Sequence, residues 1–307
     1  MSTIASFKDL LEAFRSMRCK KRIAIVCPTD EHTRDVALQC ASEDLAEITL
    51  IHTDDDTQWC RQLQEKYPQH VTTILAGSPD DACRKAVAEV RQNKADVIMK
   101  GLINTDNLLR AVLDKEHGIL RKGNVMTHLT AAEIPGYDHL LLFSDAAVIP
   151  YPDLTQMDAM VRYGVNMCRR LGSDTPNVAL IHFTEKTSEK FPYTIDYATL
   201  KERADNGDYG SVHMAGPMDV KSACDAHSAQ VKGIESDVTG HADMLIFPNL
   251  TAANTFYKTL TLFGHSSNAA IVCGADAPIV VPSRADSAES KFYSLALACV
   301  AATSDRN

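Results

Sequence analysis

Short apolar runs and stretches of helical periodicity alternate along most of the chain. The apolar runs predict strands at residues 22–28, 47–53, 71–77, 95–101, 139–149, 177–183 and 243–249, with two short strands around a turn within 268–281. The amphipathic stretches predict helices at residues 4–17, 31–46, 80–93, 105–114, 154–171, 196–206 and 251–263, and another after Ser283–Arg284. Such alternation is typical of mainly parallel sheets that helices cover on both faces, so we predict an α/β fold.

Local signals mark some boundaries of these elements. Thr105 or Asp106 is a suitable N-cap for the helix at 105–114, and Gly172 suits the end of the helix before it. The 307 residues are enough for about two domains. The pattern is least continuous around Pro150–Pro152, where we place the first domain boundary.

Composition and charge narrow the classes of function. Hydrophobic residues make up 45% of the chain and charged residues 23%, as in ordinary globular proteins. The formal net charge of −9 argues against nucleic-acid binding, which needs a basic surface. The longest apolar run has about eight residues, far fewer than the roughly 20 that span a bilayer. We therefore predict neither a nucleic-acid partner nor membrane insertion.

The spacing of the cysteines and the absence of common motifs argue against metal ions and nucleotide cofactors. The nine cysteines include no CxxC pair, which predicts free thiols in a reducing cytoplasm, with one reactive cysteine as the alternative. The fingerprints GxGxxG, GxxxxGK[ST], HExxH and GxSxG are absent. The eleven histidines show no compact metal-binding spacing, so we predict no metal site.

Polar residues follow several of the predicted strands. They are Lys100 with Asn104, Ser144 with Asp145, Asn249, and Ser283 with Arg284. Ligands of open α/β sheets bind beyond the carboxyl ends of the strands. We therefore expect a polar ring assembled from distant parts of the chain.

Ser283 and Arg284 lie where a strand gives way to a helix. Pro282 ends the strand, and either Ser283 or Asp286 can cap the next helix, since each has an acid three positions later. Arg284 is then free to bind a phosphate with its bidentate guanidinium group. The alternative is a capped helix with a solvated arginine.

Two further pairs fit an anionic ligand. Asn254 and Lys258 lie at i and i+4 of a predicted helix, so an amide and an ammonium group share one face. Thr127 and His128 lie in a turn that enters a strand. The alternatives are a surface lysine on an amphipathic helix and a histidine with a structural hydrogen bond. Together these small polar and cationic groups favour a phosphate-bearing ligand.

Five segments, in the same order, resemble the phosphate acetyl/butyryltransferase family. The segments are 99–119, 134–156, 215–228, 240–260 and 274–298, which together cover most of the chain from about residue 95 onward. The form SRADSAESK at 283–291 and the short chain look closer to the phosphate butyryltransferase branch than to the acetyl branch.

The resemblance implies two α/β/α domains of the isocitrate-dehydrogenase-like type, with the active site in an interdomain cleft. The chain would cross back, so the first domain would contain residues 1–145 and 275–307, and the second 146–274. The resemblance also implies a homodimer or higher homo-oligomer. The reaction would be acyl-CoA + phosphate ⇌ acyl phosphate + CoA, with coenzyme A and phosphate as substrates and no cofactor.

The family's active-site residues map onto several positions of this chain. Its Ser-Arg pair falls on Ser283 and Arg284, and its Gly-Asn…Tyr-Lys motif falls on Ala253, Asn254, Tyr257 and Lys258. The motif glycine is therefore Ala253, a change that affects how closely the backbone can approach a ligand. Lys100, Thr127, His128, Ser144 and Asp145 complete the predicted substrate-binding set.

The resemblance leaves the identity of the general base open. Acetyl-branch enzymes have an aspartate at the position of Ser290. On an ideal helix Asp286 shares a face with Ser290, whereas Glu289 points about 100° away. We therefore predict Asp286 as the base, with His128 or Asp145 next in line.

Three functions follow as hypotheses. The first is direct attack of the CoA thiolate on an acyl phosphate in a ternary complex, with butyryl as the expected acyl group and acetyl as the alternative. The second is an oxidoreductase of the same architecture, which a missing acidic cluster disfavours. The third is a non-catalytic regulator that binds acyl-CoA or phosphate.

Overall fold

The computed structural model describes residues 3–283 and 286–302, which form two compact units. Unit 1 contains the chain up to Phe7 and Thr127–Asn268, and unit 2 contains Lys8–Met126 and the chain from Ala269 onward. The predicted domain boundaries at residues 146 and 275 differ from the limits of these two units. The division into domains stays a prediction. The predicted α/β class with mainly parallel sheets is confirmed.

The sheet of unit 2 has a reversal in its strand order. Its strands run in the order β3-β2-β1-β4-β11-β10, with the bounds β1 (Lys21–Val26), β2 (Ala46–His52), β3 (Val71–Leu75), β4 (Val97–Lys100), β10 (Ser267–Cys273) and β11 (Ile279–Val280). Neighbouring strands are parallel except β10 and β11. The chain moves outward from β1 to β3 and then returns to β4 on the other side of β1. Ligands of open α/β sheets bind at such a reversal.

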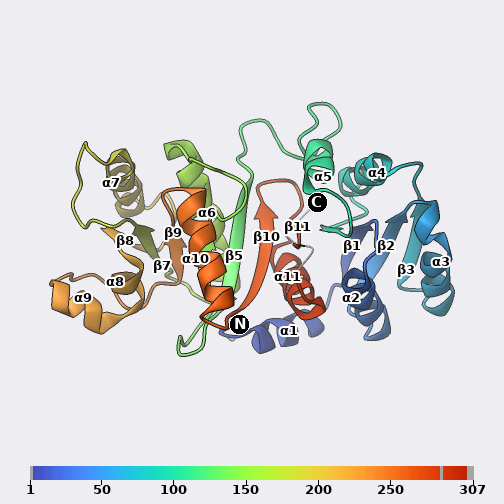
Figure 1. Ribbon diagram of the computed structural model, residues 1–307, viewed down its shortest axis with the longest axis horizontal. Coiled ribbons are helices and arrows are strands. Elements are labelled where there is room, and N and C mark those ends of the chain that lie inside the picture. The colour runs from blue at the N-terminus through green and yellow to red at the C-terminus, as the bar shows by residue number, and fades with distance from the viewer. Residues whose placement is uncertain (1–2, 284–285, 303–307) are drawn as a thin grey trace. The chain divides into compact units, whose positions relative to one another are not determined.

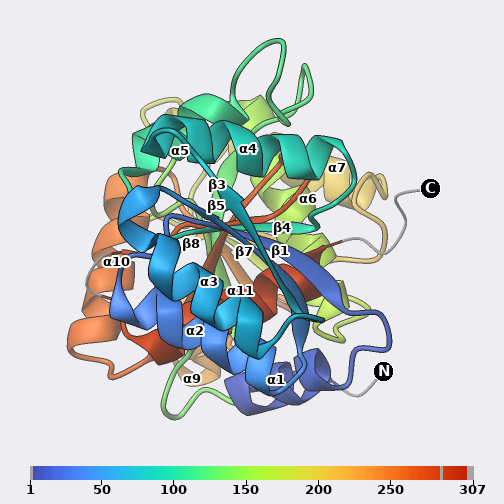
Figure 2. The same cartoon turned by 90° about the vertical axis from the view of Figure 1, so that its right-hand side faces the viewer.

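Helices cover both faces of this sheet. They are α1 (Phe7–Arg15), α2 (Glu31–Ser42), α3 (Thr57–Lys66), α4 (Pro79–Arg91), α5 (Thr105–Val112) and α11 (Ala288–Ala301), with a 3₁₀ turn, η1 (Asp54–Asp56). Figures 1 and 2 show α4 and α5 on one face and α2, α3 and α11 on the other. Right-handed crossovers explain this division, because the direction of travel across the sheet reverses after β3.

The sheet of unit 1 has the order β5-β6-β9-β7-β8, with only β5 and β6 antiparallel. Its strands are β5 (Thr127–Glu133), β6 (Leu141–Ser144), β7 (Asn177–Ile181), β8 (His213–Met218) and β9 (Met244–Ile246). Its helices are α6 (Leu154–Arg170), α7 (Pro192–Asp205), α8 (Val220–Cys224), α9 (Ala226–Lys232) and α10 (Leu250–Leu262). The sheet lies between α6 and α10 (Figures 1 and 2). Phe143 packs edge-to-face against Phe247 and Phe256 in its core.

Some elements were not predicted, and the predicted N-cap of α5 was wrong. Helix α3 buries only Cys60 and Leu63, so its apolar stripe is too narrow to show clear periodicity. Strand β8 contains Gly216–Pro217, which interrupts a strand pattern, and α8 and α9 have only five and seven residues. The N-cap of α5 is Asn104 rather than Thr105 or Asp106. Among the described residues, no helix is long and apolar enough to cross a membrane.

Candidate functional site

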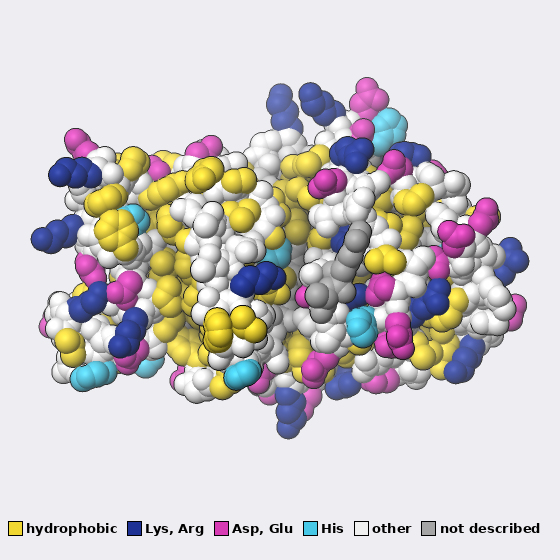
Figure 3. Space-filling view, in the orientation of Figure 1, with side chains coloured by type: hydrophobic (Ala, Val, Ile, Leu, Met, Phe, Trp, Pro, Cys, Tyr) yellow, Lys and Arg dark blue, Asp and Glu magenta, His cyan; other side chains and the backbone are white. Residues whose placement is uncertain are grey.

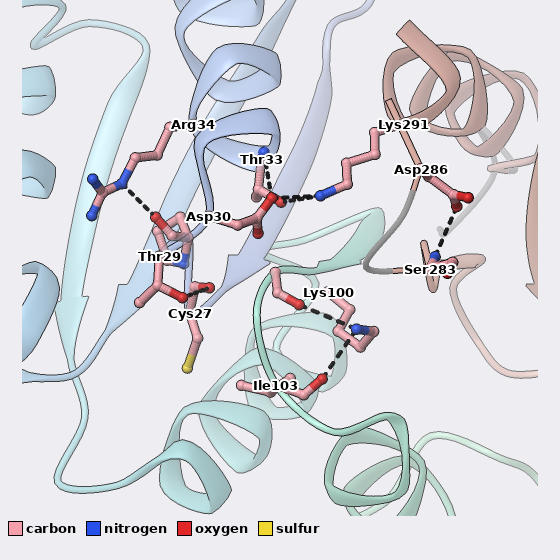
Figure 4. A network of polar contacts seen from close by, with 12 residues as sticks. Cys27, Thr29, Asp30, Thr33, Arg34, Lys100, Ile103, Ser283, Asp286 and Lys291 are labelled. Atoms are coloured by element: carbon pink, nitrogen blue, oxygen red, sulfur yellow. Dashed lines mark hydrogen bonds and ion pairs between the residues drawn. The ribbon is translucent and has the colours of Figure 1, made fainter. Parts of the chain in front are cut away.

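Three predicted site residues lie at one edge of the unit 2 sheet. Lys100 ends β4, while Ser283 and Asp286 follow β11, which runs parallel to β4. Figure 4 shows them at the carboxyl ends of these strands, beside the segment that follows β1. This edge is the point where the strand order reverses. The predicted gathering of Lys100 with the Ser283 segment is therefore present within unit 2.

Backbone contacts form the base of this edge. The Gly101 N–H donates to the Val26 carbonyl at 2.8 Å, and the Leu102 N–H donates to the Cys27 carbonyl at 3.0 Å. A Cβ atom at Gly101 would lie 2.1 Å from the Cys27 carbonyl oxygen, which is closer than non-bonded atoms can approach. Only glycine allows the segments after β1 and β4 to lie this close.

Lys100 is buried and held by its own loop. Its side-chain ammonium donates to the carbonyl oxygens of Gly101 at 3.2 Å and Ile103 at 3.1 Å. The residue is only 4% exposed. These bonds fix the turn that follows β4, and the role of Lys100 as a substrate ligand stays a prediction.

The start of α11 differs from the predicted cap. Its N-cap is Ser287, whose hydroxyl accepts from the Ser290 N–H at 3.2 Å, so neither Ser283 nor Asp286 caps the helix. Asp286 instead accepts the Ser283 N–H at 2.8 Å. Because Asp286 precedes the helix, the argument that it shares a helical face with Ser290 does not apply. Arg284 lies outside the described residues, and the choice of Asp286 as base stays a prediction.

An ion pair between a buried lysine and a half-buried aspartate lies beside these residues, and sequence reasoning missed it. Lys291 on α11 donates to Asp30 Oδ1 at 2.5 Å and to Thr33 Oγ1 at 3.3 Å (Figure 4). Burial opposes the ionisation of Asp30, but the hydrogen bonds from Lys291 and Thr33 prevail and lower its pKa. A lysine within the apolar run of the last helix was the one signal that could have indicated this pair.

The cysteine beside this edge is not a nucleophile. Cys27 is buried, and burial raises the pKa of its thiol to about 12. Burial also raises the pKa of Cys60 to about 12 and of Cys83 and Cys224 to about 11. The nine cysteines are all free thiols, as predicted. Thiols held protonated in this way are poor nucleophiles near neutral pH.

In unit 1, Thr127, His128, Ser144 and Asp145 form one cluster where β5 begins and β6 ends. The Asp145 carboxylate accepts from Thr127 Oγ1 at 2.7 Å and from the His128 N–H at 2.9 Å. It also accepts the N–H groups of the next loop, Ala147 and Val148, both at 2.8 Å. Ser144 donates its hydroxyl to the His128 carbonyl at 2.9 Å.

These hydrogen bonds give the cluster a structural role. Thr127, Ser144 and Asp145 are at most 1% exposed, and four donors already occupy the Asp145 carboxylate. The four donors hold the carboxylate in one place between β5 and the loop after β6. The role of Asp145 as an alternative base stays a prediction.

The predicted residues of α10 are also placed in unit 1. Asn254 donates its side-chain amide to the Ala146 carbonyl at 3.0 Å, which links α10 to the loop after Asp145. The Lys258 ammonium lies 4.2 Å from the centre of the Tyr257 ring. Ala253 is fully buried in the hydrophobic core of unit 1, so its methyl group packs there. The surface over α10 in Figure 3 is largely uncharged, and Lys258 is the helix's single charged residue.

Other parts of the molecule offer no alternative site among the described residues. A hollow of about 850 Å³ between α4 and α5 is lined by Arg84, Arg91 and Arg110 among others, and it contains none of the predicted site residues. Within the part of the chain that the structure describes, no group of three or more His, Cys, Asp or Glu residues is placed to hold a metal ion. The candidate site therefore rests on the strand ends.

Known proteins are similar to this chain in sequence over most of its length. Residues 57–299 match the model of the phosphate acetyl/butaryl transferase family. The chain is 33% identical over 304 residues to a phosphate butyryltransferase of Clostridium beijerinckii, covering 98% of this chain and 99% of that protein. It is 32% identical over 281 residues to a phosphate acetyltransferase of Thermotoga maritima, covering 91% and 95%.

A solved structure shows the same fold. The crystal structure of a branched-chain phosphotransacylase from Enterococcus faecalis V583 superimposes with a TM-score of 0.78. The two chains are 24% identical, and the match covers 92% of this chain and 99% of the other. At this level of identity the likeness establishes the architecture alone.

Proposed function

The chain belongs to the phosphate acetyl/butyryltransferase family of enzymes, and from this premise we propose that it exchanges CoA and phosphate on a short-chain acyl group. The reaction is acyl-CoA + phosphate ⇌ acyl phosphate + CoA, with butyryl as the proposed acyl group and acetyl as the alternative. The observation that carries the proposal is the gathering of Lys100, Ser283 and Asp286 where the strand order of unit 2 reverses.

The proposed mechanism is direct transfer without an enzyme nucleophile. Asp286 takes the thiol proton of CoA, and the thiolate attacks the carbonyl carbon of the acyl phosphate. A bond forms between the thiolate sulfur and the carbonyl carbon. The bond between that carbon and the oxygen that carries the phosphoryl group breaks, and phosphate leaves. The raised pKa of Cys27, about 12, supports a route that needs no enzyme thiolate. Most of the rate enhancement then comes from holding two substrates in line.

Charge stabilisation is assigned to the strand-end residues. Arg284 holds the phosphoryl group and stabilises its negative charge as it leaves. Ser283, Asn254 or a backbone N–H donates to the carbonyl oxygen. Tyr257 and Lys258 are proposed substrate ligands because they match the family motif. Asp145 accepts the N–H groups of Ala147 and Val148, directly after Ala146, whose carbonyl accepts from Asn254. Through these bonds, the cluster of Thr127, His128, Ser144 and Asp145 supports Asn254.

We also propose a homodimer or larger homo-oligomer in the cytoplasm. The free thiols of all nine cysteines support a reducing compartment. Sedimentation or light scattering measures the oligomer directly, and a monomer at micromolar concentration would overturn that part of the proposal.

A thiol-release assay tests the function. The purified protein is mixed with butyryl-CoA, with and without inorganic phosphate, and free CoA is followed with a thiol reagent. Phosphate-dependent release of CoA is the expected result. Release of CoA at the same rate without phosphate would favour a hydrolase instead. Binding of acyl-CoA without any release of CoA would favour a binding protein.

The acyl group is tested in the same assay. Rates with acetyl-, propionyl-, butyryl- and branched acyl-CoA are compared as kcat/KM. The highest value with butyryl-CoA is the expected result, whereas the highest value with acetyl-CoA would make the protein a phosphate acetyltransferase.

A further inference from the structure

The ion pair of buried Lys291 and half-buried Asp30 connects two segments that border the candidate site. Lys291 is 3% exposed, and its ammonium bonds to Asp30 Oδ1 at 2.5 Å and to Thr33 Oγ1 at 3.3 Å. The two charged residues are 261 positions apart in the sequence. Figure 4 shows the pair bridging the start of α11 and the start of α2.

Each residue of the pair lies at the start of a helix that follows a strand of the unit 2 sheet. Lys291 lies in the first turns of α11, where its N–H donates to the carbonyl of the N-cap Ser287 at 3.1 Å. Asp30 is the N-cap of α2 and accepts the Thr33 N–H at 3.0 Å. Asp30 follows the bend after β1, and Ser287 follows the Ser283–Asp286 segment after β11.

The pair therefore spans the end of β4. Strand β4 lies between β1 and β11 in the sheet, and Lys100 ends it. A bond from the segment after β1 to the helix after β11 sets the separation of the two segments on either side of Lys100. The rest of α11 is mainly apolar and buried, so the bond from Lys291 to Asp30 supplies a directional contact near the start of the helix.

Simple stabilisation does not explain why these residues are ionic. Removing two charges from water is unfavourable, and well-packed apolar residues often serve stability as well or better. An ion pair differs from apolar packing because it fixes one geometry. The hydrogen bonds from Lys291 and Thr33 lower the pKa of Asp30, so they favour the charged carboxylate that accepts them.

We propose that Lys291 and Asp30 are positioning residues for Ser283 and Asp286, the described residues that flank Arg284 in the sequence, an inference that rests on the proposed acyl transfer. The Lys291 ammonium donates to Asp30 and Thr33, so it acts on the reaction through the placement of α11. Losing the pair shifts Ser283 and Asp286 relative to Lys100, and a displacement of this kind acts first on the handling of phosphate.

The test compares this pair with a matched ion pair at the opposite edge of the same strands. Arg22 at the start of β1 bonds to Asp96, just before β4, at 2.7 and 2.9 Å. The variants are Lys291→Met, Asp30→Asn and the double variant, with Arg22→Met and Asp96→Asn as controls. Each is checked by circular dichroism and by its thermal midpoint, and assayed well below that midpoint.

We expect Lys291→Met and Asp30→Asn each to lower kcat/KM for phosphate by at least about 10-fold. The KM for butyryl-CoA should change much less, and the double variant should be no worse than the more damaged single variant. The control variants should lose thermal stability to a similar degree but keep kcat/KM for phosphate within about 2-fold. A second readout is the rise in thermal midpoint with inorganic phosphate, which should shrink only in the Lys291 and Asp30 variants.

Several outcomes overturn the inference. Unchanged phosphate kinetics in folded Lys291→Met, equal losses in the Arg22 and Asp96 controls, or additive losses in the double variant each exclude a positioning pair. An active wild-type protein with unaffected variants refutes only this inference. A wild-type protein that neither releases CoA with phosphate nor gains stability from phosphate refutes the proposed function and this inference with it.

Discussion

Replacing Gly101 with alanine is expected to damage both the stability and the activity of unit 2. The new Cβ would lie 2.1 Å from the Cys27 carbonyl oxygen and 2.8 Å from two further backbone atoms. All three are main-chain atoms of Val26, the last residue of β1, and Cys27, the residue after it, so no side-chain rotation can relieve the clash. The packed strand ends must separate by roughly 1 Å, because interiors of this density have no spare volume.

The size of the effect follows from this geometry. Overpacking of a well-ordered interior lowers the free energy of unfolding by about 1–3 kcal/mol. The same movement displaces Lys100 and the segment after β1, and a 1 Å misplacement lowers catalysis by about 100-fold. Urea unfolding measures the first effect, and kcat/KM for phosphate in the thiol-release assay measures the second.

Gly77→Ala is the matched control for this prediction. Gly77 precedes α4 in the same unit, and a Cβ there would meet no heavy atom within 4 Å. That variant should keep wild-type activity and gain about 0.4–1 kcal/mol, because alanine restricts the unfolded chain. Gly101→Ala with stability and kcat/KM close to wild type would refute the claim that the contact between the segments after β1 and β4 shapes the site.

Three further predictions concern charged residues of the candidate site. Arg284→Ala should lower acyl transfer by at least about 100-fold in the thiol-release assay, since it removes a partner of the leaving phosphate; near-wild-type turnover would exclude this role. Asp286→Asn should lower kcat and abolish the acidic limb of the pH–rate profile, whereas Glu289→Gln should leave both unchanged. Full activity of both variants at every pH would place the base elsewhere, with His128 the next candidate. The third prediction concerns Asp30, whose pKa is lowered in the folded protein. Its ionised form therefore stabilises the fold at pH values above the unfolded-state pKa of about 3.9. This stabilisation is lost as the pH falls through the folded-state pKa. The difference in unfolding free energy between the wild type and Asp30→Asn should therefore be constant from about pH 5 to 8 and shrink below about pH 4, and a constant difference down to pH 2 would contradict the lowered pKa.

The hydrophobic pattern predicted most of the fold because the dominant elements are strongly patterned. The apolar run at 22–28 becomes β1 (Lys21–Val26), where five of six residues are buried. The run at 154–171 becomes α6 (Leu154–Arg170), followed by Gly172 with a positive φ of 104°. Periodicity failed where burial is slight or the element is short, as in α3, α8 and α9.

The candidate site was predicted in part for the same reason. Lys100 and Ser283 follow strands, and parallel strands place such residues at one edge of a sheet, so their meeting in unit 2 was predictable. The capping role of Ser283 and Asp286 was wrong because several residues in SRADSAES have capping side chains, and the backbone selects Ser287 among them. Local sequence offers the candidates, but the entry angle of the chain decides which one bonds.

The sequence by itself determined the alternation of strands and helices, the kinds of residue at the strand ends, and the family. Only the tertiary structure decided which distant residues meet. The pair of Lys291 and Asp30 depends on β1, β4 and β11 being neighbours in that order, and the saturation of Asp145 depends on β5 lying antiparallel to β6. Strand order is set by the packing of the whole unit, and periodicity along the chain reports only which face of each element is buried.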